Sequence, residues 1–310
     1  MITWNKLGQV HSPKGDKYWN QKYDILPVPE YIDDLDRIRI YIGTTDVENF
    51  GRITYIEVDA NNPLNIVYEH NDFILDLGED GTFDDCGVVP SCIIHRDGKS
   101  LLYTVGFQRC VKVPYMLFAG LAIGDKGNPD SFKRFSKAPI LPRTPERPIS
   151  QGAPWVLWDD GLFKMWHWFG TKWIDIEGKP FIDYHIGYAE SIDGLQWDMK
   201  SEPCLWPIQE KGEFAVARPC VIKLRNIYHM WYSVRLEKVM YRIAYATSSD
   251  GRNWNRHEGN IGLNVSEHGW DSQMVCYPAV IKIKNRLLMF YNGNNNGETG
   301  FGVAESIIDE

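Results

Sequence analysis

Four acidic side chains share one position in the sequence. Each lies five to seven residues ahead of a proline that begins a short apolar run. When carboxylates from separate segments converge, repulsion raises the pKa of some and leaves others low, which separates an acid from a base. Glycoside cleavage uses such a pair. The candidate catalytic residues are therefore Asp24, Asp85, Glu213 and Asp271.

Roles can be assigned within this set. Asp85 is the preferred base or nucleophile, Glu213 the preferred acid, and Asp271 a third carboxylate that orients or tunes them. Each acid could equally cap backbone amides or hold a neighbouring segment, because structural ion pairs also cluster. The sequence alone leaves both interpretations open.

Aromatic, amide and basic side chains occupy the same segments as the acids or the loops expected to face them. Aromatic rings can stack on the apolar face of a sugar, and arginine can hold a carboxylate or phosphate through two parallel hydrogen bonds. Arg218 and Arg235 are expected to bind an anionic substituent on a sugar, or simply to neutralise the acids. The expected substrate-binding residues are Asp84, Arg109, Gln151, Lys172, Trp173, Arg218, Arg235, Arg242, Tyr277 and Asn292.

The elements that position these residues repeat about every sixty residues. The prolines that begin the apolar runs are separated by 64, 65 and 59 residues, and one period earlier the chain again carries prolines. They are Pro90, Pro154, Pro219 and Pro278, preceded by Pro27 and Pro29. Each run is followed by a second strand with a central aromatic residue and then by a third apolar strand. Repeats of this length are typical of propellers.

The repeat predicts an all-β fold: one five-bladed β-propeller domain over residues 1–310, with four-stranded antiparallel blades. Two Ser-x-Asp-Gly turns, at 191–194 and 248–251, lead to a fourth strand that begins with tryptophan. The last unit lacks that strand, and residues 2–6 resemble it, so the N-terminal segment is expected to close the ring. A β-sandwich predicts no such repeat, and separate small domains predict linkers that are not seen.

Strand direction in a propeller places the candidate residues on one face. The segment before each first strand and the loop from the second to the third strand meet at one end of the axis, whereas the Asp-Gly turns lie at the other end. We therefore expect the acids, arginines and aromatic residues to surround an axial pocket.

Composition excludes several classes of function. The 310 residues carry 33 basic and 41 acidic side chains, a net charge of −8, which argues against a general nucleic-acid binder. No apolar run is long enough for a membrane span, and the first residues are not a signal peptide, so a cytoplasmic protein is expected. We expect no metal site, because the eight histidines and six cysteines are scattered and form no HExxH or CxxC motif. We also expect no cofactor, because the sequence has no nucleotide-binding loop.

Taken together, the repeated strands and the Ser-x-Asp-Gly-x-x-Trp turns resemble the superfamily of five-bladed propeller glycosidases that includes arabinanases, levansucrases and invertases. The resemblance covers essentially the whole chain. It is closer to glycosidase-like proteins associated with bacterial surface-polysaccharide genes, through residues 81–85, 269–272, 291–293 and 299–302. It implies a carbohydrate-active enzyme: a glycoside hydrolase, or a glycosyl-transferring enzyme or phosphorylase.

The chain also departs from these relatives. It lacks the Asn-Asp-Pro, Arg-Asp-Pro and Glu-Cys-Pro motifs of the invertase-like enzymes, and Gln151 stands where the arabinanase-like pattern has an acid. In related phosphorylases basic residues bind phosphate, a role open here to Arg109, Arg218, Arg235 and Lys238. Two alternatives to an enzyme are a non-catalytic carbohydrate-binding propeller and a protein-interaction platform.

Overall fold

The computed structural model describes residues 2–238, 240–257 and 263–308. Nearly all of its regular structure is β-strand, and consecutive strands pair antiparallel in sets of four. The first set is β2 (Lys22–Ile32), β3 (Arg37–Thr45), β4 (Gly51–Asp59) and β5 (Ile66–Glu69). The second is β6 (Gly87–Arg96), β7 (Lys99–Arg109), β8 (Tyr115–Asp125) and β9 (Asn128–Arg134).

The later sets follow the same pattern. The third is β10 (Ser150–Asp159), β11 (Leu162–Ile176), β12 (Lys179–Ser191) and β13 (Asp198–Met199). The fourth is β14 (Glu213–Leu224), β15 (Ile227–Leu236), β16 (Met240–Ser248) and β17 (Asn255–His257). The closing set is β18 (Cys276–Ile283), β19 (Arg286–Asn292), β20 (Phe301–Ile307) and β1 (Asn5–His11). The described helices are short: η1 (Asp33–Leu35), η2 (Gln209–Lys211) and α1 (Asn294–Gly297).

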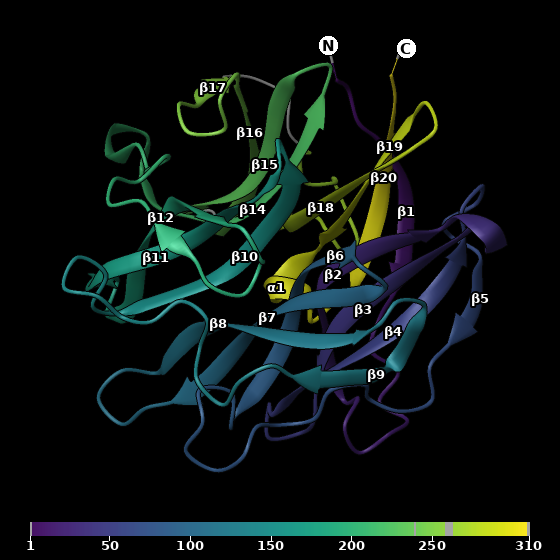
Figure 1. Cartoon of the computed structure of the whole chain (residues 1–310), viewed down its shortest axis with the longest axis horizontal. Helices are drawn as coiled ribbons and strands as arrows, with labels where there is room; N and C mark the ends of the chain where they lie inside the picture. The colour runs from purple at the N-terminus through teal and green to yellow at the C-terminus, as the bar shows by residue number, and fades with distance from the viewer. Residues whose placement is uncertain (1, 239, 258–262, 309–310) are drawn as a thin grey trace.

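The first strands of the sets meet around a centre. β2, β6, β10, β14 and β18 contact one another in that order, and β18 contacts β2. Figure 1 shows the strands arranged about this centre, with β5, β9 and β17 at the periphery. Side chains join neighbouring first strands: the Ser91 hydroxyl donates to the Pro154 carbonyl at 2.8 Å, and the Trp155 indole donates to the Val221 carbonyl at 2.7 Å.

The N-terminal segment closes the last set, as expected. β1 pairs antiparallel with β20, and Figure 1 shows the two ends of the chain close together. The strand begins later than predicted, at Asn5 rather than Ile2, and Trp4 instead packs edge-on against Trp231 at 5.6 Å between ring centroids.

Trp4 nevertheless occupies the place of the tryptophans that follow the Asp-Gly turns. The central aromatic residue of a second strand contacts such a tryptophan from the next set: Tyr103 contacts Trp197 at 6.0 Å, and Trp166 contacts Trp254 at 6.2 Å. The turns themselves dock on the same rings, since the Trp166 indole donates to the Gly251 carbonyl at 2.7 Å. The Asp-Gly turns are therefore structural.

Neighbouring sets also approach closely at the backbone. Gly51 of β4 pairs in parallel with Gly87 of β6, and Gly87 has a φ of 150°. A Cβ on Gly87 would lie 2.7 Å from the Gly51 nitrogen, so a side chain has no room there. Among the described residues, no helix is long and apolar enough to cross a membrane.

Candidate functional site

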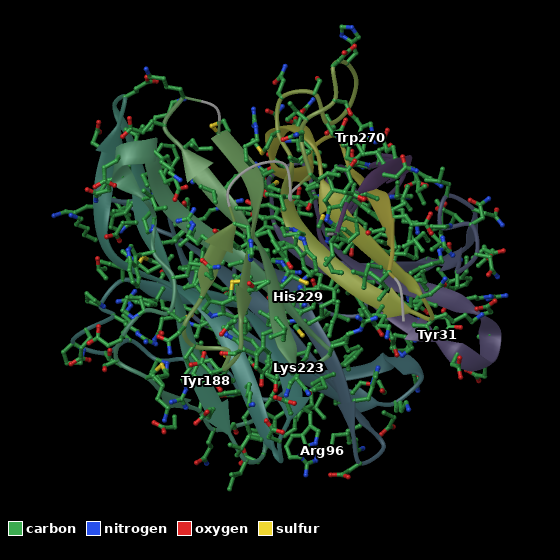
Figure 2. The ribbon with its side chains drawn as sticks, turned by 90° about the horizontal axis from the view of Figure 1, so that it is seen from above. Tyr31, Arg96, Tyr188, Lys223, His229 and Trp270 are labelled. Atoms are coloured by element: carbon green, nitrogen blue, oxygen red, sulfur yellow. The ribbon has the colours of Figure 1, made fainter. Side chains whose placement is uncertain are left out.

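A cavity of about 710 Å³ lies where the first strands meet. It is lined by residues of the first strands and by the ends of the second and third strands with the loops between them. Figure 2 shows Trp270, which precedes β18, and Arg96, at the β6–β7 turn, at opposite ends of the molecule. The loops before the first strands and the turns after them therefore lie on opposite faces, as the strand directions predict.

The residue immediately before the first-strand proline lines the cavity in every set. In four of the five it has a positive φ, between 46° and 57°, a conformation that residues other than glycine rarely adopt. A β-bulge interrupts strand pairing at this point in the same four sets, and directly after the proline, between Pro90 and Cys92, in the second set. Strain and bulges of this kind re-aim side chains at functional sites. The five residues are Leu26, Val89, Ala153, Arg218 and Tyr277.

This arrangement also changes the alignment of the first set. The bulge lies between Ile25 and Val28, so Pro27, and not Pro29, corresponds to the prolines of the other sets. Asp24 then stands three residues ahead of its proline, where the third set has Gln151. The spacing that grouped Asp24 with Asp85 in the sequence is therefore wrong.

Arg218 is the most deeply buried charged residue of the cavity wall. Its side chain is 1% exposed, and its guanidinium lies 5.3 Å from the centre of the Trp155 ring. None of the nitrogens Nε, Nη1 and Nη2 has a hydrogen-bond partner. Burial lowers the pKa of Arg218 to about 10, so the group is still charged at neutral pH.

A second arginine is held among aromatic rings. The guanidinium of Arg235 lies 4.1 Å from the Phe181 ring centre and 4.9 Å from that of Tyr241, and its buried Nε has no partner. Tyr277 packs beside Tyr241 at 5.5 Å and donates its hydroxyl to Asn296 Oδ1 at 3.3 Å. This side of the cavity thus presents a cation and phenol hydroxyls on an apolar wall.

The rim carries a third arginine and one acid. Arg109 stacks on Phe50 at 4.3 Å and donates to the backbone carbonyl of Glu48. Of the described residues that line the cavity, Glu48 is the one carboxylate. The cavity lining is therefore positively charged overall.

The cavity lining includes none of the four predicted catalytic carboxylates. Glu213 accepts two hydrogen bonds from Arg256, at 2.7 and 2.9 Å, and one from the Ile208 amide at 2.8 Å. Asp271 binds Lys6 at 2.5 Å and the Tyr291 hydroxyl at 3.0 Å. These two acids hold segments of the fold together, which is the structural interpretation that the sequence left open.

Asp24 and Asp85 lie beside the cavity lining but are not part of it. Asp24 is fully buried, and its Oδ2 lies 2.7 Å from Nδ1 of His11, while burial raises the pKa of Asp24. Asp85 Oδ2 accepts the Gly81 amide at 3.0 Å, and Asp85 precedes Cys86, which lines the cavity. In each of the two acids Oδ1 is buried without a hydrogen-bond partner.

Four of the ten predicted substrate-binding residues line the cavity: Arg109, Arg218, Arg235 and Tyr277. Three others are framework residues. Asp84 is buried and paired with Arg134 at 2.6 Å, and the Gln151 amide donates to the Pro142 carbonyl at 2.5 Å. Asn292, fully buried, joins backbone groups of β2 and the closing set.

The remaining three predicted binding residues stand away from the lining as well. Lys172 is exposed, and its backbone amide donates to Asp183 at 2.9 Å. Trp173 is not part of the lining and packs edge-on against Tyr115, a lining residue, at 5.5 Å between ring centroids. Arg242 donates to the backbone carbonyls of Tyr241 and Gln273.

The sequence analysis missed much of the cavity wall. The lining residues outside the predicted set that carry polar side-chain groups are Tyr23, Thr45, Glu48, Asn49, Cys86, Tyr115, Trp168, Tyr184, Tyr241 and Asn296. The tyrosines lie in or next to strands whose apolar sequence predicts buried core residues. Only the residue before each first-strand proline carries a usable sequence signal. Among the described residues, no group of three or more His, Cys, Asp or Glu side chains is placed to hold a metal ion.

Comparison with known proteins gives relatives over the whole length. No protein-family model matches the chain. Two proteins of Mycobacterium tuberculosis, Rv1502 of strain H37Rv and MT1551 of strain CDC 1551, are each 36% identical over 303 residues. The alignment covers 98% of this chain and 99% of each relative. This chain belongs to their family.

Solved structures with the same fold are glycoside hydrolase-like propellers. One glycoside hydrolase has a TM-score of 0.73 at 19% identity, and the match covers 98% of this chain and 91% of that enzyme. A glycosyl hydrolase from Bacteroides ovatus has a TM-score of 0.72 at 13% identity, covering 98% and 93%. The endo-arabinase from Bacteroides thetaiotaomicron has a TM-score of 0.67 at 13% identity, covering 98% of both chains. This chain therefore shares the fold of these glycoside hydrolases.

Proposed function

We propose that the protein is a single five-bladed propeller that binds a carbohydrate in its axial cavity. The blade count is supported by the ring of contacts from β2 through β6, β10, β14 and β18 back to β2. A carbohydrate ligand is supported by the glycoside hydrolase-like structures that share the fold.

The observation that carries this proposal is the composition of the cavity wall. Its volume of about 710 Å³ is within the range of small-molecule sites. Trp168 and several tyrosines supply flat apolar surface, while phenol hydroxyls and guanidinium groups supply hydrogen bonds. A sugar ring has an apolar face and a rim of hydroxyls, so this wall matches both of its surfaces.

Recognition is favoured over hydrolysis by the positions of the acids. Two-carboxylate cleavage needs a pair about 5–10 Å apart across the glycosidic bond. Glu48 is the one carboxylate of the described lining, while Glu213 and Asp271 are bound to Arg256 and Lys6. The positions of these acids support recognition as the first candidate function.

Hydrolysis or phosphorolysis is the second candidate, because of Asp85. Its Oδ1 is buried without a partner, and the next residue, Cys86, lines the cavity. An unpartnered carboxylate oxygen costs free energy unless it serves a ligand or a reaction. In this alternative Asp85 is the base or nucleophile, as the sequence analysis expected.

We further propose that the protein acts in the cytoplasm. All six cysteines are free, including the exposed Cys110. Free thiols at the surface are typical of proteins in reducing compartments.

A panel of mono- and oligosaccharides tests these functions. Thermal shift and calorimetry measure binding, and mass spectrometry of the incubated sugar measures turnover. Binding without turnover supports recognition. Turnover that is lost in Asp85→Asn but kept in Glu213→Gln supports the enzyme and assigns Asp85 to it. If no sugar binds and none is turned over, both functions are wrong.

A further inference from the structure

Arg218 carries a buried positive charge for which the described residues of the protein supply neither a counter-ion nor a hydrogen-bond acceptor. We infer that the ligand of the cavity carries an anionic group, a carboxylate or a phosphate, that Arg218 binds, with Arg235 as a second contact. The inference rests on the proposed function, which makes the ligand a sugar. The inference specifies the chemical class of that sugar, namely one with an anionic group.

The burial of Arg218 is the first step of the argument. A guanidinium has five N–H donors and no acceptor, and a charge removed from water is costly unless it is paired and hydrogen-bonded. Arg218 is 1% exposed and has no hydrogen-bond partner for any of its three nitrogens. Paired arginines elsewhere in the chain show what is missing: Arg256 binds Glu213 through two hydrogen bonds.

The surroundings of Arg218 offer no internal anion. The neighbouring Cys92 and Cys220 are fully buried thiols, and burial raises their pKa values to about 11 and about 12. They are neutral at pH 7. Trp155 lies against the guanidinium but offers only a ring face. The counter-charge must therefore come from the cavity that the Arg218 side chain lines.

The backbone supports a ligand-binding role for this position. Arg218 has a φ of 51° at a bulge of β14, where strand pairing shifts between Ala217 and Cys220. The bulge places a long basic side chain at the cavity wall where the third set has Ala153. The nitrogens are shielded in the ligand-free form, so binding includes a change of side-chain rotamer that turns the N–H groups to the anion.

The charges of the other lining residues also favour an anionic ligand. Arg235 and Arg109 also line the cavity, against one carboxylate, Glu48, among the described lining residues. The Arg235 guanidinium lies 4.1 Å from the Phe181 ring centre and 4.9 Å from that of Tyr241, so aromatic rings surround it. A guanidinium favours bidentate partners, and both carboxylates and phosphates provide them.

The test compares anionic sugars with their neutral counterparts in the wild type and in Arg218→Met. Calorimetry measures affinity for glucuronate and N-acetylneuraminate, for glucose 1-phosphate and glucose 6-phosphate, for glucose, and for acetate and inorganic phosphate alone. Comparing the affinities of the carboxylate sugars with those of the sugar phosphates decides which anion is preferred. Arg252→Met, which removes an exposed arginine bound to Glu190, is the control.

We expect at least one anionic sugar to bind on the order of 100-fold more tightly than glucose, and Arg218→Met to abolish that preference. We also expect the melting temperature of the ligand-free protein to rise in Arg218→Met, because methionine fills the space without an unpaired charge. Arg252→Met should change neither value.

Each other outcome contradicts one specific claim of the proposal. If glucose binds as tightly as the anionic sugars, the anionic class is wrong while the carbohydrate function stands. If acetate or phosphate binds through Arg218 but no sugar binds, the carbohydrate function is wrong while the anion site stands. If Arg218→Met lowers the melting temperature and leaves affinities unchanged, Arg218 is structural and the inference is overturned.

Discussion

Asn292 joins the two ends of the ring through its side chain, and its replacement is a direct test of that closure. The side chain is fully buried, and its Oδ1 accepts the Leu26 amide at 2.8 Å. Its Nδ2 donates to the carbonyl of Asp24 at 2.6 Å and to that of Gly300 at 3.1 Å. One side chain thus serves three backbone groups from β2 and the closing set.

The expected cost of Asn292→Ala follows from these contacts. Each buried backbone group left without a partner costs about 1–3 kcal/mol. The Gly300 carbonyl keeps the Gly293 amide as a partner at 3.3 Å, so two groups lose their partner and the free energy of unfolding should fall by about 2–6 kcal/mol. Asn292→Asp keeps the acceptor for Leu26 but sets a carboxylate oxygen against two carbonyls, so it should be at least as destabilising.

Urea denaturation followed by tryptophan fluorescence measures this loss. The matched control is Asn61→Ala, which removes one exposed hydrogen bond to Asp36 and should cost less than about 0.5 kcal/mol. A loss below about 1 kcal/mol in Asn292→Ala would refute the reasoning from burial. Unchanged stability with weakened sugar binding would instead make Asn292 a binding residue, as its sequence position suggested.

Three other changes have defined outcomes. Arg256→Met leaves buried Glu213 without its partner and should lower the free energy of unfolding by about 3 kcal/mol, measured in urea. Tyr103→Phe removes a 2.9 Å hydrogen bond to the carbonyl of an Asp-Gly turn and should cost about 1 kcal/mol by the same assay. Burial and the adjacent Arg147 lower the pKa of His167 from 6.5 to about 3, so only the unfolded state is protonated between those values. Stability should fall by about 1.4 kcal/mol per pH unit as pH drops from 6.5 toward 3, and His167→Gln should flatten that part of a urea-midpoint profile.

The strands could be predicted because local sequence determines them. Apolar runs begun by proline, aromatic second strands and Asp-Gly turns each satisfy a local requirement of backbone or packing. The repeat then fixes their order, and even the closing strand was expected from the likeness of Trp4 to Trp254. Its exact start was not, because β1 takes its register from bulges against β20 that leave no mark in the sequence.

The roles of the acids could not be predicted, because their partners are distant in the sequence. Asp271 binds Lys6, 265 residues away, and Glu213 binds Arg256, 43 residues away. An acid ahead of a strand looks the same whether it faces a ligand or an internal lysine. Arg218, by contrast, could be recognised from its place directly before a first-strand proline.

The pairing of β1 with β20 has a consequence for how the chain folds. Residues 5–11 are made before the other strands of the ring, and their partners at 301–307 are made after them. Until then β1 has no strand edge to pair with. Contacts between such distant segments make folding slow and leave strand edges open to other chains. The incomplete ring therefore exposes unpaired strand edges until β20 is made.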